Sequence, residues 1–202
     1  LGTAQFGMDY GITNAKGKVR RDDSLEILNF ANSCGIDTLD TAQDYGDAEE
    51  LINYNRKIKD QFKINTKINF QIEEFYSNHP LSSMEKKFEE SLSKLDTHTI
   101  NGLLIHNGYI LNKDSYGLIE WLETCKERKK IKIFGASLYE DSKLDEEIFK
   151  HLDFIQIPFS IFNQNCEKNY VIQLCKKYKV SIHVRSIFCQ GLVLANTHNL
   201  PD

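Results

Sequence analysis

The chain has 202 residues, of which 41% are hydrophobic and 27% charged, a balance typical of a globular protein rather than a disordered one. A formal net charge of -4 argues against a broad basic surface for nucleic acid, and no apolar run is long enough to cross a bilayer. The five cysteines form no CxxC pair and no cluster with metal-site spacing, so we expect reduced thiols in a cytoplasmic protein without a metal site.

Short β-branched or aromatic runs alternate with amphipathic helical runs along the chain. Strands are predicted at residues 1–6, 36–41, 62–69, 99–107, 131–139, 153–162 and 180–193. Apolar residues recur at steps of three or four between residues 81 and 95, and again between residues 170 and 178. This spacing predicts two helices that each bury one face.

Alternating strands and helices predict an α/β fold with a parallel sheet, either a doubly wound open sheet or a (β/α) barrel. The opening stretch that includes the first predicted strand, Gly2-Thr3-Ala4-Gln5-Phe6-Gly7, lacks the GxGxxG spacing of a doubly wound dinucleotide domain. About seven strands are present, whereas a complete barrel has eight and about 250 residues. We therefore expect a (β/α)8 TIM barrel in a single domain over residues 1–202, with its last helix, strand and helix missing and residues 200–202 near the start of that missing part.

Polar side chains close three successive predicted strands. Asp40 ends the second strand, Lys67 lies near the end of the third, and His106 ends the fourth. The carboxyl ends of barrel strands open on one face, so these residues should meet at one rim. Tyr45 follows Asp40 by a short loop and can fold back over the same place.

These four residue types suit carbonyl reduction, in which hydride reaches the carbonyl carbon and the oxygen needs a proton. Tyr45 would hold its proton at neutral pH, because the ordinary pKa of tyrosine is about 10. The ammonium of Lys67 should lower the pKa of Tyr45, and Asp40 should keep that ammonium charged and in place. His106 would donate a hydrogen bond to the carbonyl oxygen, where negative charge grows.

At these residues the sequence resembles the aldo-keto reductase family. Asp40-Thr41-Ala42-Gln43-Asp44-Tyr45-Gly46-Asp47-Ala48-Glu49 is similar to the family's DTAxxYGxxE signature. Thr66-Lys67 and Leu103-Leu104-Ile105-His106 match its strand-end lysine and histidine, and the opening residues 1–7 resemble its first strand. The resemblance implies an enzyme in which Tyr45 donates the proton, Lys67 and Asp40 tune it, and His106 orients the substrate carbonyl.

The resemblance also implies NADPH, or alternatively NADH, bound across the barrel mouth without a Rossmann domain. Gly2 and Thr3 would border the nicotinamide ribose, Ser137 and Gln156 would hold the carboxamide, and Ser186, Gly191 and Leu192 would begin the pyrophosphate cradle. With Asp40, the implied cofactor-binding residues are Gly2, Thr3, Asp40, Ser137, Gln156, Ser186, Gly191 and Leu192.

Two positions depart from the family pattern. Leu138 stands where many members have Asn, and Arg185 stands where many have a Tyr that stacks on the nicotinamide; a planar guanidinium could stack there instead. The combination of residues 135–139 with residues 184–192 resembles a bacterial subgroup linked to surface carbohydrates. This resemblance points to a small carbonyl substrate derived from a sugar. The oligomeric state is left open. Two alternatives also remain: a cofactor-binding subunit without catalysis, and an isomerase or lyase that uses Lys67 as a Schiff base.

Overall fold

The structure is a computed structural model that describes residues 1–70, 80–112, 115–139, 142, 144–165 and 170–195. Two features discussed from the sequence fall outside these ranges: Cys166, which is one of the five cysteines, and the segment 200–202 that was expected near the start of a missing helix. None of the described helices combines the length and the apolar character needed to cross a membrane.

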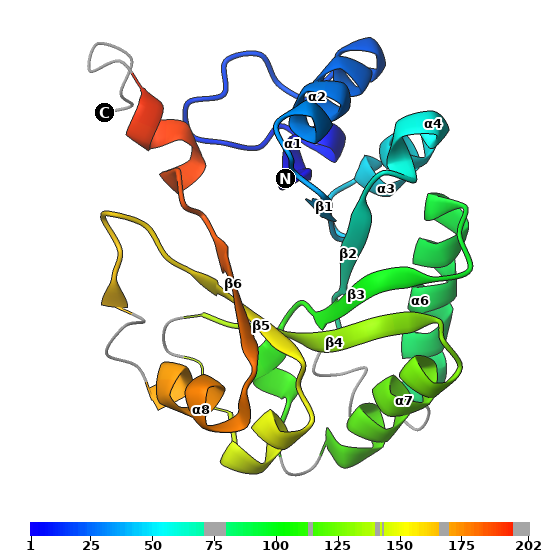
Figure 1. Ribbon diagram of the computed structural model, residues 1–202, viewed down its shortest axis with the longest axis vertical. Helices are drawn as coiled ribbons and strands as arrows, with labels where there is room; N and C mark the ends of the chain where they lie inside the picture. Colours follow the sequence, from blue (N-terminus) through cyan, green and yellow to red (C-terminus); the bar gives the residue numbers. More distant parts are fainter. Residues whose placement is uncertain (71–79, 113–114, 140–141, 143, 166–169, 196–202) are drawn as a thin grey trace.

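The core of the fold is one parallel sheet whose strands follow each other in chain order, β1-β2-β3-β4-β5-β6. The strands are β1 (Thr38–Asp40), β2 (Lys63–Ile68), β3 (Ile100–Ile105), β4 (Ile131–Ser137), β5 (Phe154–Pro158) and β6 (Ser181–Arg185). The sheet curls into part of a barrel, with β1 and β6 at its two edges and the helices on its outer side (Figure 1). The expected barrel class is therefore confirmed.

Helices connect successive strands and cover the outside of the sheet. The α-helices are α1 (Ala4–Gly7), α2 (Arg21–Ser33), α3 (Ala48–Tyr54), α4 (Arg56–Lys59), α6 (Pro80–Leu95), α7 (Tyr116–Glu127) and α8 (Tyr170–Tyr178), and the 3-10 helices are η1 (Gly108–Ile110), η3 (Glu146–Lys150) and η5 (Cys189–Leu194). The predicted helical faces are confirmed at Met84, Phe88 and Leu92 of α6 and at Leu174 of α8, which are buried, whereas Leu81 and Tyr170 at the helix starts are exposed.

The prediction of about seven strands is wrong for the described residues, which contain six. Only residues 1–3 lie parallel beside β1, where the Thr3 amide donates to the Asp40 carbonyl and the Asp40 amide donates to the Leu1 carbonyl. This pairing is a single bridge at Gly2, after which the chain turns into α1. The turn occurs because Phe6 is buried and Gly7 packs against the loop that follows β1.

The last predicted strand, residues 180–193, is also shorter than expected. β6 ends at Arg185, and the chain then winds into η5, where Gln190 and Gly191 have left-handed φ angles of 56° and 96°. An extended strand does not contain such residues. The segment instead lies against the N-terminal loop, where the Thr13 hydroxyl donates to the Gln190 carbonyl at 3.4 Å.

Candidate active site

Asp40 and Lys67 form an ion pair at the carboxyl ends of β1 and β2. Nζ of Lys67 lies 2.7 Å from Oδ2 of Asp40 and donates a second hydrogen bond to the Thr41 carbonyl at 2.9 Å. The side chains of Lys67 and Asp40 are 1% and 27% exposed. Burial lowers the pKa of Lys67, and Asp40 opposes this effect by stabilising the ammonium. Asp40 therefore helps to keep a buried cation charged.

Tyr45 and His106 lie against this ion pair. Nζ of Lys67 is 5.0 Å from the centroid of the Tyr45 ring. The rings of Tyr45 and His106 meet edge to face, with centroids 6.0 Å apart. The structure thus brings the four predicted residues together at one rim, from β1, β2, the end of β3 and the loop after β1.

Two glycines hold the backbone of the Tyr45 loop close to α1. A Cβ atom on Gly7 would come within 1.6 Å of the Tyr45 carbonyl oxygen, and one on Gly46 within 2.2 Å of the Gly7 carbonyl oxygen. Gly46 also has a φ of 58°, which favours glycine. The backbones at Gly7 and Gly46 are in direct contact, so Gly46 of the motif helps to position Tyr45, the residue before it.

The prediction that Lys67 lowers the pKa of Tyr45 is wrong for this structure. Burial raises the pKa of Tyr45 to about 12, the charge of Asp40 raises it further, and Arg185 opposes the rise. A half-buried phenol resists ionisation because the phenolate loses hydration. The carboxylate of Asp40 also offsets part of the positive charge of the ammonium that was expected to favour the phenolate. Tyr45 therefore keeps its proton at neutral pH.

Asp44 is a site residue that the sequence reasoning missed. Its Oδ2 lies 3.3 Å from Nδ1 of His106, within the distance of an ion pair. The interaction with His106 lowers the pKa of Asp44. Because Nδ1 faces Asp44, Nε2 is the ring nitrogen left for a ligand. The position of Asp44 inside the motif, between Asp40 and Tyr45, was the available signal.

Gln156 connects the far side of the barrel to the ion pair. Its Nε2 donates to Oδ1 of Asp40 at 2.8 Å, although β5 and β1 are not neighbours in the sheet. Its Oε1 is buried and lacks a hydrogen-bond partner within the described ranges. Ser137 pairs with Gln156 in the ladder between β4 and β5, and both side chains are 3% exposed. The unpaired acceptor Oε1 of Gln156 thus lies on the strand beside Ser137. This arrangement suits a primary carboxamide, which donates through its N–H groups and accepts through its oxygen.

The other residues predicted to bind the cofactor lie at the two edges of the sheet. Gly2 bridges Asp40, and the buried Thr3 hydroxyl donates to the Asp40 carbonyl at 3.1 Å. Ser186, with a φ of 62°, and Gly191 and Leu192 follow β6. A Cβ atom on Gly191 would come within 2.2 Å of the Thr13 hydroxyl. Within this loop the N–H groups of Cys189 and Gly191 already donate to the carbonyls of Ser186 and Phe188, so they are not free to bind an anion.

Both departures from the family pattern are visible. Leu138 is fully buried, so it packs in the core and offers no polar group. Arg185 extends from the end of β6 to the end of β4, where Nη2 donates to the Leu138 carbonyl at 3.3 Å. Its Cζ lies 4.8 Å from the centroid of the Tyr139 ring. The guanidinium does stack, but on Tyr139 of the same chain.

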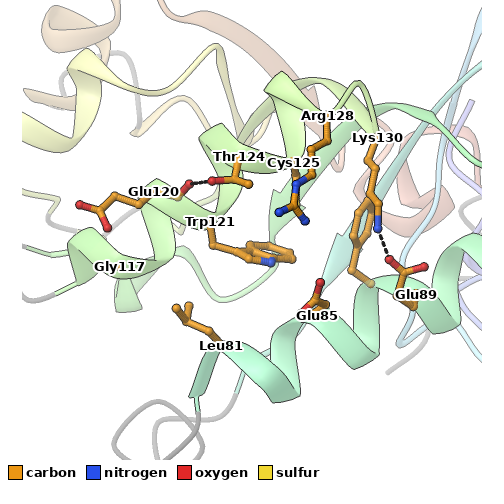
Figure 2. Close-up of a pocket in the computed structure, with 11 residues that line it drawn as sticks. Leu81, Glu85, Glu89, Gly117, Glu120, Trp121, Thr124, Cys125, Arg128 and Lys130 are labelled. Carbon is orange, nitrogen blue, oxygen red and sulfur yellow. Dashed lines mark hydrogen bonds and ion pairs between the residues drawn. The ribbon is translucent and has the colours of Figure 1, made fainter.

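A separate pocket lies between α6 and α7 on the outer side of the sheet (Figure 2). Trp121, Glu85 and Glu89 line it together with Lys130, the residue before β4. Lys130 and Glu89 form an ion pair there. Lys130 marks the amino end of its strand, whereas Asp40, Lys67 and His106 lie at carboxyl ends. None of the residues predicted to act in catalysis lines this pocket.

A sequence profile described as the aldo/keto reductase family matches residues 1–202. The chain belongs to the aldo/keto reductase family. This finding confirms the resemblance inferred from the motifs, and with it the assignment to the oxidoreductases. A search of curated proteins found no match.

Solved structures of aldo-keto reductases have the same fold. An enzyme from Bacillus halodurans in its holo form has a TM-score of 0.73 and 21% identity over 95% of this chain and 62% of its own. One from Klebsiella pneumoniae in complex with NADPH has a TM-score of 0.71 and 19% identity over 95% and 64%. A glycerol dehydrogenase from Gluconobacter oxydans has a TM-score of 0.72 and 24% identity over 98% and 62%. The chain thus spans less than two thirds of each of these three proteins.

Proposed function

We propose that the protein reduces an aldehyde or ketone to an alcohol with NADPH, or with NADH in its place. The observation that carries this proposal is the contact of Tyr45 with the buried Lys67–Asp40 ion pair and with His106. A proton donor, a cation and a second hydrogen-bonding ring lie around one point. That arrangement suits an oxygen atom that gains negative charge as the carbonyl is reduced.

The described residues fit a nicotinamide cofactor. The unpartnered Oε1 of Gln156 offers an acceptor for the carboxamide N–H group, with Ser137 beside it. The loop after β6, which holds Ser186, Gly191 and Leu192, would begin the cradle for a pyrophosphate. Gly2 and Thr3 border the same mouth through their contacts with Asp40. When bound, the cofactor supplies the hydride.

Each of the four catalytic residues has a separate role in this proposal. Tyr45 donates its proton to the carbonyl oxygen, and its raised pKa of about 12 keeps that proton available at neutral pH. Lys67 stabilises the phenolate that remains, and Asp40 holds Lys67 in place. His106 donates a hydrogen bond to the carbonyl oxygen through Nε2, because its Nδ1 faces Asp44.

The test is the variant Tyr45→Phe, which removes the proton and keeps the ring. We expect the turnover of aldehydes to fall by about 100- to 10,000-fold, the range for loss of a general acid. The dissociation constant for NADPH, followed by fluorescence, should change less than threefold, because the phenol hydroxyl is assigned to the substrate. Full turnover in the variant would exclude Tyr45 as the acid. Tight NADPH binding by the unaltered protein without any turnover would favour the non-catalytic alternative.

A further inference from the structure

Arg185 brings a second cation to the barrel mouth, and none of the residues that the structure describes is its counter-ion. Its guanidinium donates one hydrogen bond, to the Leu138 carbonyl, and rests on the ring of Tyr139. Its Nε is buried and has no hydrogen-bond partner within the part of the chain that the structure describes. No carboxylate of the described residues lies within ion-pair distance of it, as those of Asp40 and Asp44 do for Lys67 and His106.

The charge of Arg185 reaches the reacting groups. It opposes the rise in the pKa of Tyr45 that burial and Asp40 cause. It also adds to the effect of burial in lowering the pKa of Lys67. Arg185 also ends β6, so it lies at the same carboxyl-end face of the sheet as the proton donor. Among the described residues Asp40 pairs with Lys67, whereas the charge of Arg185 has no such carboxylate partner.

The stack on Tyr139 holds the guanidinium ready for a ligand. The central carbon of the guanidinium lies over the ring, 4.8 Å from its centroid, and the Nε donor has no hydrogen-bond partner among the described residues. Tyr139 is 55% exposed, so the stack lies on the solvent side of the mouth. A planar group with fixed donors binds a carboxylate or a phosphate through two parallel hydrogen bonds.

We propose that Arg185 binds an anionic group on the carbonyl substrate, so that the enzyme reduces aldehydes or ketones that also carry a carboxylate or a phosphate. This inference rests on the proposed function, because it names the substrate class of the same site. It makes Arg185 a specificity-determining residue. Tyr139 is a positioning residue that keeps the guanidinium over the mouth.

The experiment compares matched pairs of substrates that differ in one anionic group. Succinic semialdehyde is paired with butanal for the carboxylate, and glyceraldehyde 3-phosphate with glyceraldehyde for the phosphate. The readout is the ratio of kcat/KM for the anionic member to that for its neutral partner. We expect the full chain to give a ratio of at least about ten for one pair, and the pair that does so identifies the anion. Arg185→Gln should lower that ratio by about 10- to 100-fold, the range for a lost hydrogen bond between charged groups.

Two further variants separate a ligand contact from a general effect of charge or structure. Arg185→Lys keeps the positive charge and loses the planar group with two parallel N–H donors. Its kcat/KM ratio should therefore lie between those of the unaltered protein and Arg185→Gln. Lys130→Gln removes one positive charge on the outer side of the sheet, and the ratio should stay the same. A ratio lowered equally by Lys130→Gln would show that only the net charge matters, and would overturn the proposal.

The outcomes also distinguish this inference from the proposed function. Turnover of neutral and anionic members at equal efficiency overturns the role of Arg185 and leaves the reductase assignment standing. The role of Arg185 is also overturned, and the reductase assignment stands, if Arg185→Gln lowers kcat/KM equally for both members of a pair. The same holds if the main change in Arg185→Gln is weaker NADPH binding. If no carbonyl is reduced with either NADPH or NADH, the proposed function fails and the inference fails with it.

Discussion

Strands β2 and β6 each bring a cation to the barrel mouth, and the two are held in opposite ways. Lys67 of β2 is 1% exposed, pairs with Asp40 and donates to a backbone carbonyl. Arg185 of β6 is partly exposed, makes one hydrogen bond of 3.3 Å and leaves Nε without a partner in the described structure. The first cation completes a network within the protein, and the second lacks the anion that would complete one.

The two strands also differ in how deeply their residues are buried. Every residue of β2 after its first is buried, whereas Ser181, Ile182 and Val184 of the edge strand β6 are exposed. Buried charges are costly to separate from their partners, and exposed charges are screened by water. Removing one positive charge should therefore have very different effects on the free energy of unfolding at the two positions.

The largest effect is expected for Lys67→Met. This change leaves the carboxylate of Asp40 without its ammonium, and we expect the free energy of unfolding to fall by about 3 kcal/mol, as for other broken buried ion pairs. Chemical denaturation at neutral pH measures it. The matched control is Asp40→Asn/Lys67→Met, in which no charge is left alone, and which should be more stable than Lys67→Met. A double variant that is less stable than Lys67→Met would show that the ion pair is not the cause.

A smaller effect is expected at Glu49, a buried acid that has no ion pair among the described residues. Glu49 of α3 is 1% exposed and accepts a hydrogen bond from the Thr66 hydroxyl at 2.6 Å. Its Oε2 is buried without a hydrogen-bond partner within the described ranges. Burial raises the pKa of Glu49, so the folded protein holds this proton more tightly than the unfolded chain. Stability is then greatest below the ordinary pKa of 4.5 and falls as the pH rises through the raised pKa.

The variant Glu49→Gln should remove this dependence. At pH 8 it should be more stable than the unaltered protein by about 1 kcal/mol, because a neutral amide replaces a buried carboxylate. The gain should shrink toward pH 4.5, where the unaltered side chain is also protonated. Melting temperatures of both proteins across this pH range measure the difference. A gain that is constant with pH would show that the charge of Glu49 is not its cause.

The sequence predicted those parts of the site that depend on local pattern. Asp40, Lys67 and His106 were found because each follows a hydrophobic run, and the carboxyl ends of parallel strands share one face. The contact of Gln156 with Asp40 was not predicted, because it crosses the barrel and depends on how far the sheet curls. The direction of the pKa shift of Tyr45 was missed because it depends on burial, which residue types alone do not give.

The fold, like the site, was predicted where it depends on local pattern and missed where it depends on contacts between distant residues. The six sheet strands were found from apolar runs, whereas residues 1–6 have the composition of a strand and form only one bridge. Contact between Gly7 and the backbone at Tyr45, which lies far along the chain, ends that strand early. The stack of Arg185 on Tyr139 is a similar case, since it joins the ends of β6 and β4 across β5.

The smallest effect on stability is expected for Arg185→Gln, although this variant should change substrate preference strongly. The side chain contributes one long hydrogen bond and one stack on a half-exposed ring, so we expect a loss of about 0.5 to 1 kcal/mol by chemical denaturation. Tyr139→Ala should have a similar cost, and the double variant should cost less than the sum, because the two side chains contact each other. A low cost in stability with a large change in substrate ratio is the pattern of a residue that acts through a ligand. If Arg185→Gln cost as much as Lys67→Met, Arg185 would be part of the folded framework, and the contrast between the two cations would not hold.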